Sequence, residues 1–245
     1  MIEFFKTIFY IPLLNLLVWL YDVLPWQDLG LAIIVLTILI KLILYPLNKK
    51  AILSQKALQD LQPKLTEIKE KYGKDKEAQA RATMELYKKE KINPASSCLP
   101  ILIQLPFLIA VYQVFRTGLA NGYLEYLYPF IQNPGSLNTL AFGFIELSQR
   151  SIWLALLAGA AQFWQGKMLT TKKPEIKSAE SKDENMAAIM NKQMIYVMPI
   201  FTVFIGLSFP AGLTLYWFVN TVLTGLQQLI VFKNNKHDTN VKTVN

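Results

Sequence analysis

The chain has 245 residues, of which 53% are hydrophobic and 17% charged, and its net charge is +8. This composition is too apolar and too segmented for one ordinary soluble domain, and it predicts a membrane protein. The only cysteine is Cys98 and the only histidine is His237, in a polar tail. A disulfide framework, a histidine-based metal site and a histidine-dependent triad are therefore excluded.

Residues 2–24 are apolar but are interrupted by Lys6, Pro12 and Asn15. No small residues suitable for signal-peptide cleavage follow, since residues 22–26 are large or charged. The stretch is long enough to span a bilayer, yet its proline and its many aromatic residues favour a helix that lies in the membrane interface. We expect residues 1–24 to form such an interfacial helix on the extracytoplasmic side.

The first predicted span, residues 25–47, holds one full cation within an apolar run. As a helix, Gly30 to Leu47 would cover roughly 27 Å, and Lys41 would lie roughly 9 Å inside one end. A charge at that depth costs on the order of 2.5–3.5 kcal/mol on insertion scales. Either the ammonium snorkels to the nearby interface, or Lys41 belongs to a water-lined site. Thr37 and Tyr45 lie four residues to either side and share its helix face.

Residues 48–93 are polar and predict an antiparallel helical hairpin. Apolar residues recur at steps of three and four, at Leu58, Leu61, Leu65, Ile68 and Tyr72 and then at Ala80, Met84 and Tyr87. Gly73 is a stop signal for the first arm, and Asp75 can begin the second. Pro63 predicts a kink in the first arm.

Residues 94–232 contain four further apolar segments, predicted as spans two to five. The spans are 95–115, 150–169, 192–208 and 211–232, separated by an outer loop at 117–149, a linker at 170–191 and a tight turn at 209–212. Asn93 and Pro94 predict the start of the second span as an N-cap followed by proline. Small residues in the third span permit close helix contact. A polar tail, 233–245, follows.

The basic residues fix the predicted orientation. Of 25 Lys and Arg, twelve lie in residues 48–93, six in residues 166–192 and three in the tail. Because basic residues are enriched in cytoplasmic loops, the hairpin, the linker and the C-terminal tail are expected in the cytoplasm. The N-terminus and the outer loop are then expected outside.

The spans combine one cation with neutral polar groups. The nearest acidic residue, Glu146, lies outside them, which argues against aspartyl intramembrane proteases and carboxylate proton relays. There is no HExxH or P-loop motif. Besides Lys41 the spans contain Thr37, Gln104, Gln113, Gln162, Gln165, Thr214 and Asn220. A cation without a counter-ion indicates a wet cavity that receives an anion, although any single glutamine can serve only to tie helices together.

Four stretches together resemble one family. They are LTILIKLILYPL, LQPKLTEIKEKYGKDKE, MELYKKEKINPASSCLPILIQLPFLIAVYQVF and FPAGLTLYWFVNTVLTGLQQ. In this order they are similar to the YidC membrane-protein insertases, the bacterial relatives of the mitochondrial Oxa and chloroplast Albino insertases. The resemblance covers Asp28 to Phe232. It implies an all-α polytopic fold in which five transmembrane helices surround a hydrophilic groove, with a cytoplasmic hairpin.

The resemblance also implies a substrate-binding groove that includes Lys41, Gln162 and Trp217. To this predicted groove we add Thr37 and Gln104 from the polar residues of the spans. Lys41 would attract the acidic or polar tail of an inserting protein, Gln162 would line the groove, and Trp217 would contact the substrate. The hairpin would recruit clients. Family members usually carry arginine in place of Lys41; lysine keeps the charge but loses the forked geometry of the guanidinium.

The sequence therefore predicts an insertase of the bacterial plasma (inner) membrane that is not an enzyme and needs no cofactor or metal. Its expected partners are nascent membrane proteins with short or acidic translocated tails and anionic lipid, with the Sec translocon, the ribosome and the signal recognition particle system as further candidates. No specific nucleic acid is expected. The alternative is a small transporter or channel for an anionic solute, which an inverted repeat would favour; the sequence contains none. A purely structural scaffold would leave Lys41 unexplained.

Overall fold

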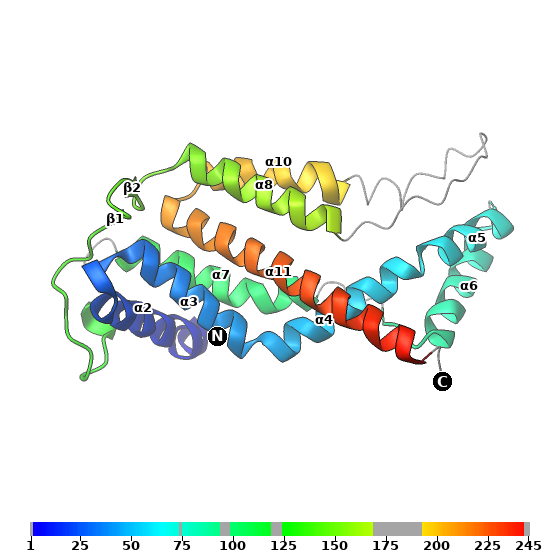
Figure 1. Ribbon diagram of the computed structural model, residues 1–245, viewed down its shortest axis with the longest axis horizontal. Helices are drawn as coiled ribbons and strands as arrows, with labels where there is room; N and C mark the ends of the chain where they lie inside the picture. The colour runs from blue at the N-terminus through cyan, green and yellow to red at the C-terminus, as the bar shows by residue number, and fades with distance from the viewer. Residues whose placement is uncertain (1, 74, 94–98, 119–123, 169–192, 243–245) are drawn as a thin grey trace.

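The computed structural model describes residues 2–73, 75–93, 99–118, 124–168 and 193–242. Its elements are α1 (Ile2–Phe5), η1 (Lys6–Tyr10), α2 (Ile11–Val23), η2 (Pro25–Gln27), α3 (Leu29–Ile43), α4 (Tyr45–Asp60), α5 (Gln62–Tyr72), α6 (Lys76–Lys89), α7 (Leu99–Gly118), η4 (Leu124–Tyr126), β1 (Leu140–Ala141), β2 (Ile145–Glu146), α8 (Ile152–Met168), η5 (Gln193–Val197), α10 (Met198–Gly206) and α11 (Ala211–Lys242). Long helices form a bundle at one end, and α5 and α6 project at the other (Figure 1).

The all-α prediction is confirmed, apart from one small antiparallel pair of strands. β1 and β2 are two residues long each and lie within the predicted outer loop, at the end of the bundle opposite α5 and α6 (Figure 1). Sequence patterns did not indicate them, because alternation cannot be recognised over two residues. Pro94, the first residue of the predicted second span, and the linker at 170–191 lie outside the described residues.

The number of membrane spans remains a prediction. Among the described residues, Glu3–Val23 and Ala211–Lys233 are long and apolar enough to cross a membrane, and α3 with α4 makes a third if the bent pair is one span. Shorter apolar helices cover Gln104–Phe115 and Ile195–Gly206. Length and composition thus support a polytopic protein, while the count of five rests on the sequence pattern.

Helix α11 occupies the centre of the bundle. It packs against α8 and α10 on one side and against α3, α4 and α7 on the other (Figure 1). Close packing with α8 depends on Gly225, because a Cβ at this position would lie 2.2 Å from the ring of Trp164. Gly212 allows the same approach to Phe115 of α7. The last helix therefore packs against five other helices, and its polar side chains are placed to meet polar groups from them.

The first span bends before it ends. α3 stops at Ile43, and the helical stretch Tyr45–Tyr72 departs from it at 72°. Pro46 lies in the first turn of α4, where its ring has no N–H to donate and would clash with the preceding helical turn. Residues 25–47 are therefore not one straight helix. Lys41 lies in the last turn of α3, just before the bend.

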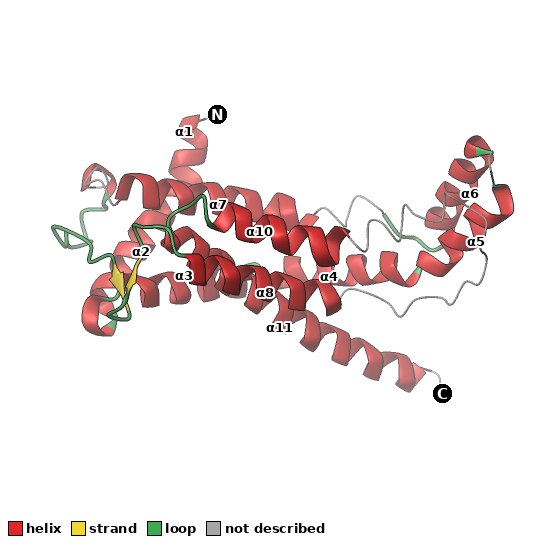
Figure 2. Cartoon of the chain, turned by 90° about the horizontal axis from the view of Figure 1, so that it is seen from above, coloured by secondary structure: helices red, strands yellow, loops and turns green. Residues whose placement is uncertain are grey.

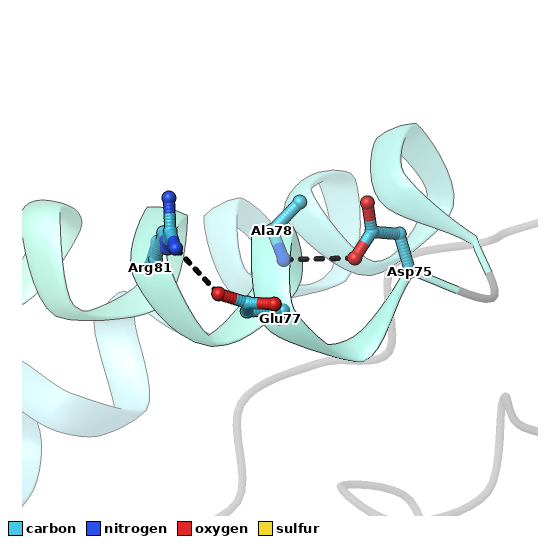
Figure 3. Close-up of polar contacts among 4 residues, drawn as sticks. All are labelled: Asp75, Glu77, Ala78 and Arg81. Carbon is cyan, nitrogen blue, oxygen red and sulfur yellow. Dashed lines mark hydrogen bonds and ion pairs between the residues drawn. The ribbon is translucent and has the colours of Figure 1, made fainter.

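The predicted hairpin is present as α5 and α6, which pack against each other. Gly73 ends α5 with a positive φ of 49°, a conformation that glycine adopts without strain. The carboxylate of Asp75 caps α6 by accepting from the N–H of Ala78 at 3.0 Å, and Glu77 pairs with Arg81 one turn on (Figure 3). The predicted kink at Pro63 corresponds to the break between α4 and α5 at Leu61.

The N-terminal helical run, α1, η1 and α2, crosses the bundle instead of running along it (Figure 2). Its polar residue Asn15 is 1% exposed and binds the outer loop. The amide nitrogen of Asn15 donates to the carbonyls of Ile11 and Tyr126, both at 2.8 Å, and its oxygen accepts from the N–H of Tyr128 at 2.6 Å. Lys6 donates to the hydroxyl of Tyr126 at 3.0 Å. The residues that interrupt the apolar pattern therefore fasten this helix to residues 126–128.

Replacing Asn15 with alanine is expected to lower stability by about 1–3 kcal/mol, since the carbonyl of Tyr126 and the N–H of Tyr128, both partly buried, lose their partner. The midpoint of thermal unfolding in detergent, followed by tryptophan fluorescence, measures the effect. Asn133→Ala is the matched control, because Asn133 is exposed and its side chain accepts from the N–H of Gly135, two residues away. Equal midpoints for the two variants would show that the contacts of Asn15 do not hold the loop.

Candidate substrate-binding site

Polar side chains follow α11 along its length and meet polar groups from four other helices, α10, α7, α3 and α4. In order these contacts are Thr214 with the carbonyl of Gly206, Tyr216 with Gln104, Thr224 with Lys41, and Gln227 with the carbonyl of Tyr45. Because an α-helix rises 1.5 Å per residue, Tyr216 and Thr224 are separated by about 12 Å along the axis. The polar groups are thus spread through the bundle along one helix.

The ammonium of Lys41 is held inside the bundle by a neutral group. Lys41 Nζ donates to Thr224 Oγ1 at 2.7 Å, and Thr224 Oγ1 in turn donates to the carbonyl of Asn220 at 2.7 Å. The threonine hydroxyl donates its hydrogen bond to the backbone, and its oxygen accepts one from the lysine. Lys41 therefore contacts α11 in the bundle, which weighs against the interpretation that it merely snorkels to the interface.

The charge of Lys41 is not neutralised by another residue of the described chain. The ion pairs found there join Lys56 with Asp60, Lys64 with Glu90, and Arg81 with Glu77, all beyond the bend at Leu44. An ammonium has three protons to donate, and Thr224 accepts one. Two donor positions and a full charge remain for an acceptor that the described residues do not supply. A carboxylate is the partner that would gain most from such a group.

Two further residues of the predicted site are already engaged. Thr37 is buried, and its hydroxyl donates to the carbonyl of Ile33 in its own helix at 2.6 Å. Gln104 on α7 donates to the hydroxyl of Tyr216, which is 1% exposed. Thr37 therefore has little left to offer a ligand. Gln104 ties α7 to α11, which is the helix-tying role considered for the glutamines in the spans.

Gln162 and Trp217 are half-buried, on α8 and α11 respectively. Among the hydrogen bonds found in the described residues, none connects either side chain to Lys41. Lys41 and Gln104 thus bond to side chains of α11, and Thr37 bonds within α3. The substrate-binding role of all five residues remains a prediction.

Three polar residues of α11 were not singled out from the sequence: Thr224, Gln227 and Gln228. Gln228 is 1% exposed, and its side-chain oxygen is buried without a hydrogen-bond partner. The available signal was spacing, because Asn220, Thr224 and Gln227 recur at steps of four and three and so share one helix face. Threonine and glutamine in an apolar segment are common, and this made the pattern easy to overlook.

The bundle has apolar helices of membrane length, a basic hairpin that projects from it and a lysine that no described residue neutralises. These features define a polytopic membrane protein with a polar interior. A family model described as "60Kd inner membrane protein" matches residues 19–239. The membrane protein insertase YidC of Fusobacterium nucleatum is 36% identical over 206 residues, covering 84% of this chain and 87% of that protein. The chain therefore belongs to the YidC family of membrane protein insertases and is a bacterial inner-membrane protein.

Other relatives are longer. The YidC insertase of Geotalea daltonii is 35% identical over 225 residues, which make up 91% of this chain but 37% of that protein. A solved structure described as an active YidC insertase with the first transmembrane domain resolved has a TM-score of 0.58 and 27% identity, and the likeness covers 91% of this chain and 45% of the other. The chain thus spans little more than a third of the length of several curated relatives it matches.

Proposed function

We propose that the protein inserts membrane proteins by admitting the polar tail of a client into a hydrophilic groove along α11 that opens toward the hairpin end of the bundle. The observation that carries this proposal is the ammonium of Lys41, which is bound by Thr224 at 2.7 Å and paired with no carboxylate of the described chain. Family membership supports the activity, and Lys41 supplies the chemistry for the step.

The barrier to insertion is the transfer of a polar tail through hydrocarbon, which costs several kcal/mol for each unsatisfied polar group. A groove reaching part of the way across shortens that path, and Lys41 offers the tail's carboxylates a charged hydrogen-bond donor. The client then leaves because its apolar segment gains free energy on entering lipid. This step needs no nucleotide, cofactor or metal.

Other helices would recruit the client and close the groove toward the outside. α5 and α6, beyond the bend of α3, are positioned to recruit nascent chains in the cytoplasm, with the ribosome, the signal recognition particle system or the Sec translocon as candidate partners. Because α1 and α2 cross the bundle, they suit a helix that lies in the extracytoplasmic interface of the inner membrane (Figure 2). The Asn15 contacts would then help to close the groove toward the outside.

The decisive experiment uses vesicles reconstituted with the purified protein. A single-span client with a short acidic tail should become protected from external protease only when the protein is present. The alternative function, transport of an anionic solute, predicts flux of small carboxylates through the same vesicles without any client. Flux without tail protection would overturn the insertase proposal in favour of the transporter.

The proposed orientation predicts where an impermeant thiol reagent can react in intact cells. In a Cys98→Ser background, Glu85→Cys on α6 should be shielded until the membrane is opened, because the basic hairpin is expected inside. Ser136→Cys in the outer loop should react at once. Both residues are exposed in the structure, so access depends on the membrane. Reaction at position 85 in sealed cells would reverse the orientation.

A further inference from the structure

The strands β1 and β2 present two aromatic rings at the turn that joins them. We call Phe142, Gly143 and Phe144 the aromatic tip. Phe142 has a φ of 53° and Gly143 one of 77°, and the N–H of Phe144 donates to the carbonyl of Ala141 at 3.1 Å. Two positive φ values in succession are those of a type I′ turn, in which asparagine or glycine is favoured at the first position. A phenylalanine there costs on the order of 1–3 kcal/mol.

The aromatic tip is fixed to the beginning of α3. One carboxylate oxygen of Asp28 caps α3 by accepting from the N–H of Leu31 at 2.9 Å, and the other accepts from the N–H of Phe142. Gly30 leaves room for the contact, since a Cβ there would lie 2.6 Å from the Cβ of Ala141 and 2.9 Å from the Phe142 ring. The strained turn is therefore held in place by two residues of one helix start.

The rings nevertheless remain open to the surroundings. Phe144 is 76% exposed and Phe142 is 40% exposed. Trp26, just before α3, and Trp153, at the start of α8, are 89% and 78% exposed, and both elements begin at this end of the bundle (Figure 1). The turn is strained, and its phenylalanine rings are exposed at the end of the bundle where these two tryptophans are also exposed. Because backbone strain of this kind clusters at functional sites, we infer that the exposed rings have a function.

We propose that the aromatic tip is a membrane anchor that inserts into the lipid headgroup and acyl boundary of the leaflet opposite the α5–α6 hairpin. Tryptophan and tyrosine concentrate at this depth in membrane proteins, and phenylalanine is common on the apolar side of segments that lie in the interface. The pairing of β1 with β2, the bond from the N–H of Phe144 to the carbonyl of Ala141 and the bond from the N–H of Phe142 to Asp28 satisfy part of the backbone at the tip, which lowers the cost of entering an apolar environment. Because Asp28 joins the tip to α3, the anchor also sets the depth of that helix. Lys41 lies about 20 Å further along the helix axis from Asp28.

Charge favours lipid as the occupant over an ionic protein partner. Residues 124–149 contain Glu125 and Glu146 and no lysine or arginine, and the nearest basic residue along the chain after the tip is Arg150, just before α8. The strand turn itself therefore carries no cation for an acidic surface. The hydroxyl and the N–H of Ser148 donate to Glu146 and hold the pKa of that carboxyl below its ordinary value. Attachment must therefore rest on the rings. It should be as strong to zwitterionic phosphatidylcholine as to membranes with added anionic lipid.

The test places an environment-sensitive fluorophore at Phe144→Cys in a Cys98→Ser background, in full-length protein reconstituted into phosphatidylcholine vesicles. Blue-shifted emission, quenched by lipids carrying a shallow nitroxide and not by aqueous iodide, is the expected result. The matched control is Ser136→Cys, an exposed polar position in the same loop, which should be quenched by iodide. Iodide quenching at position 144 would overturn the anchor, and so would protection from both quenchers, which indicates a covering protein such as a second copy.

The depth-setting role has its own measurement. A fluorophore at Leu42→Cys, a 62% exposed position next to Lys41, reports the depth of α3 through the ratio of quenching by shallow and deep nitroxide lipids. Phe144→Asn removes an exposed ring and keeps the fold, so this ratio should shift when the two changes are combined. An unchanged ratio would show that the tip does not set the depth of α3. Neither fluorescence measurement depends on insertion activity.

Discussion

Changing Lys41 to leucine should reduce the insertion of clients with acidic tails by about tenfold or more, since a hydrogen bond to a charged group contributes about 1.5–3 kcal/mol. Lys41→Arg should retain most of the activity, because arginine keeps the charge. The protein itself should remain as stable as before or become more stable, because a costly charge leaves the apolar segment. Tail protection in reconstituted vesicles and thermal unfolding in detergent measure the two effects separately.

A double-mutant cycle tests whether the ammonium meets the client's carboxylates. Replacing the Asp and Glu of the client tail with neutral residues should remove most of the sensitivity to Lys41→Leu. Lys56→Leu is the matched control, since Lys56 lies over the ring of Phe232 at 4.8 Å, beyond the bend, and its effect should not depend on the tail's charge. Additive losses for Lys41 and the tail would mean that the two charges never interact.

The features that were predictable from the sequence are those whose causes are local. Lys41 was found because a cation within an apolar run is costly wherever it lies. Gly73 and Asp75 were found because helix ends depend on the backbone conformation and capping groups of a few neighbouring residues. The stripe from Leu58 to Tyr72 gave the first arm of the hairpin by periodicity alone.

The features that escaped prediction depend on contacts between distant parts of the chain. Thr224 lies 183 residues from Lys41, and a threonine in an apolar helix gives no sign of such a partner. In the sequence, Asn15 is only an interruption of the apolar pattern of the N-terminal helix. Its bonds to the backbone at 126–128 explain why a polar residue lies there. The bend at Leu44 was missed because Pro46 is compatible both with the end of a span and with the first turn of a new helix.

The helices α5 and α6 can be removed without disturbing the bundle, and this makes their role testable. Their two ends meet, because Lys64 pairs with Glu90 and holds the pKa of that carboxyl below its ordinary value. α4 must be kept, since Ala51 and Ile52 are buried and α4 packs against α11. The appropriate deletion therefore removes residues 62–89 and joins the remaining ends with a short Gly-Ser linker.

If the hairpin recruits clients, this deletion variant should be as stable as the full chain in detergent and yet insert nascent membrane proteins poorly in cells. The defect should shrink in purified vesicles supplied with excess client, because recruitment limits the rate only when clients are scarce, whereas Lys41→Leu should remain defective at any client concentration. The matched control reverses the ion pair within α6 by Glu77→Arg and Arg81→Glu, which keeps the net charge and the helix. Normal insertion by the deletion variant in cells would show that α5 and α6 do not recruit clients and only connect α4 with α7.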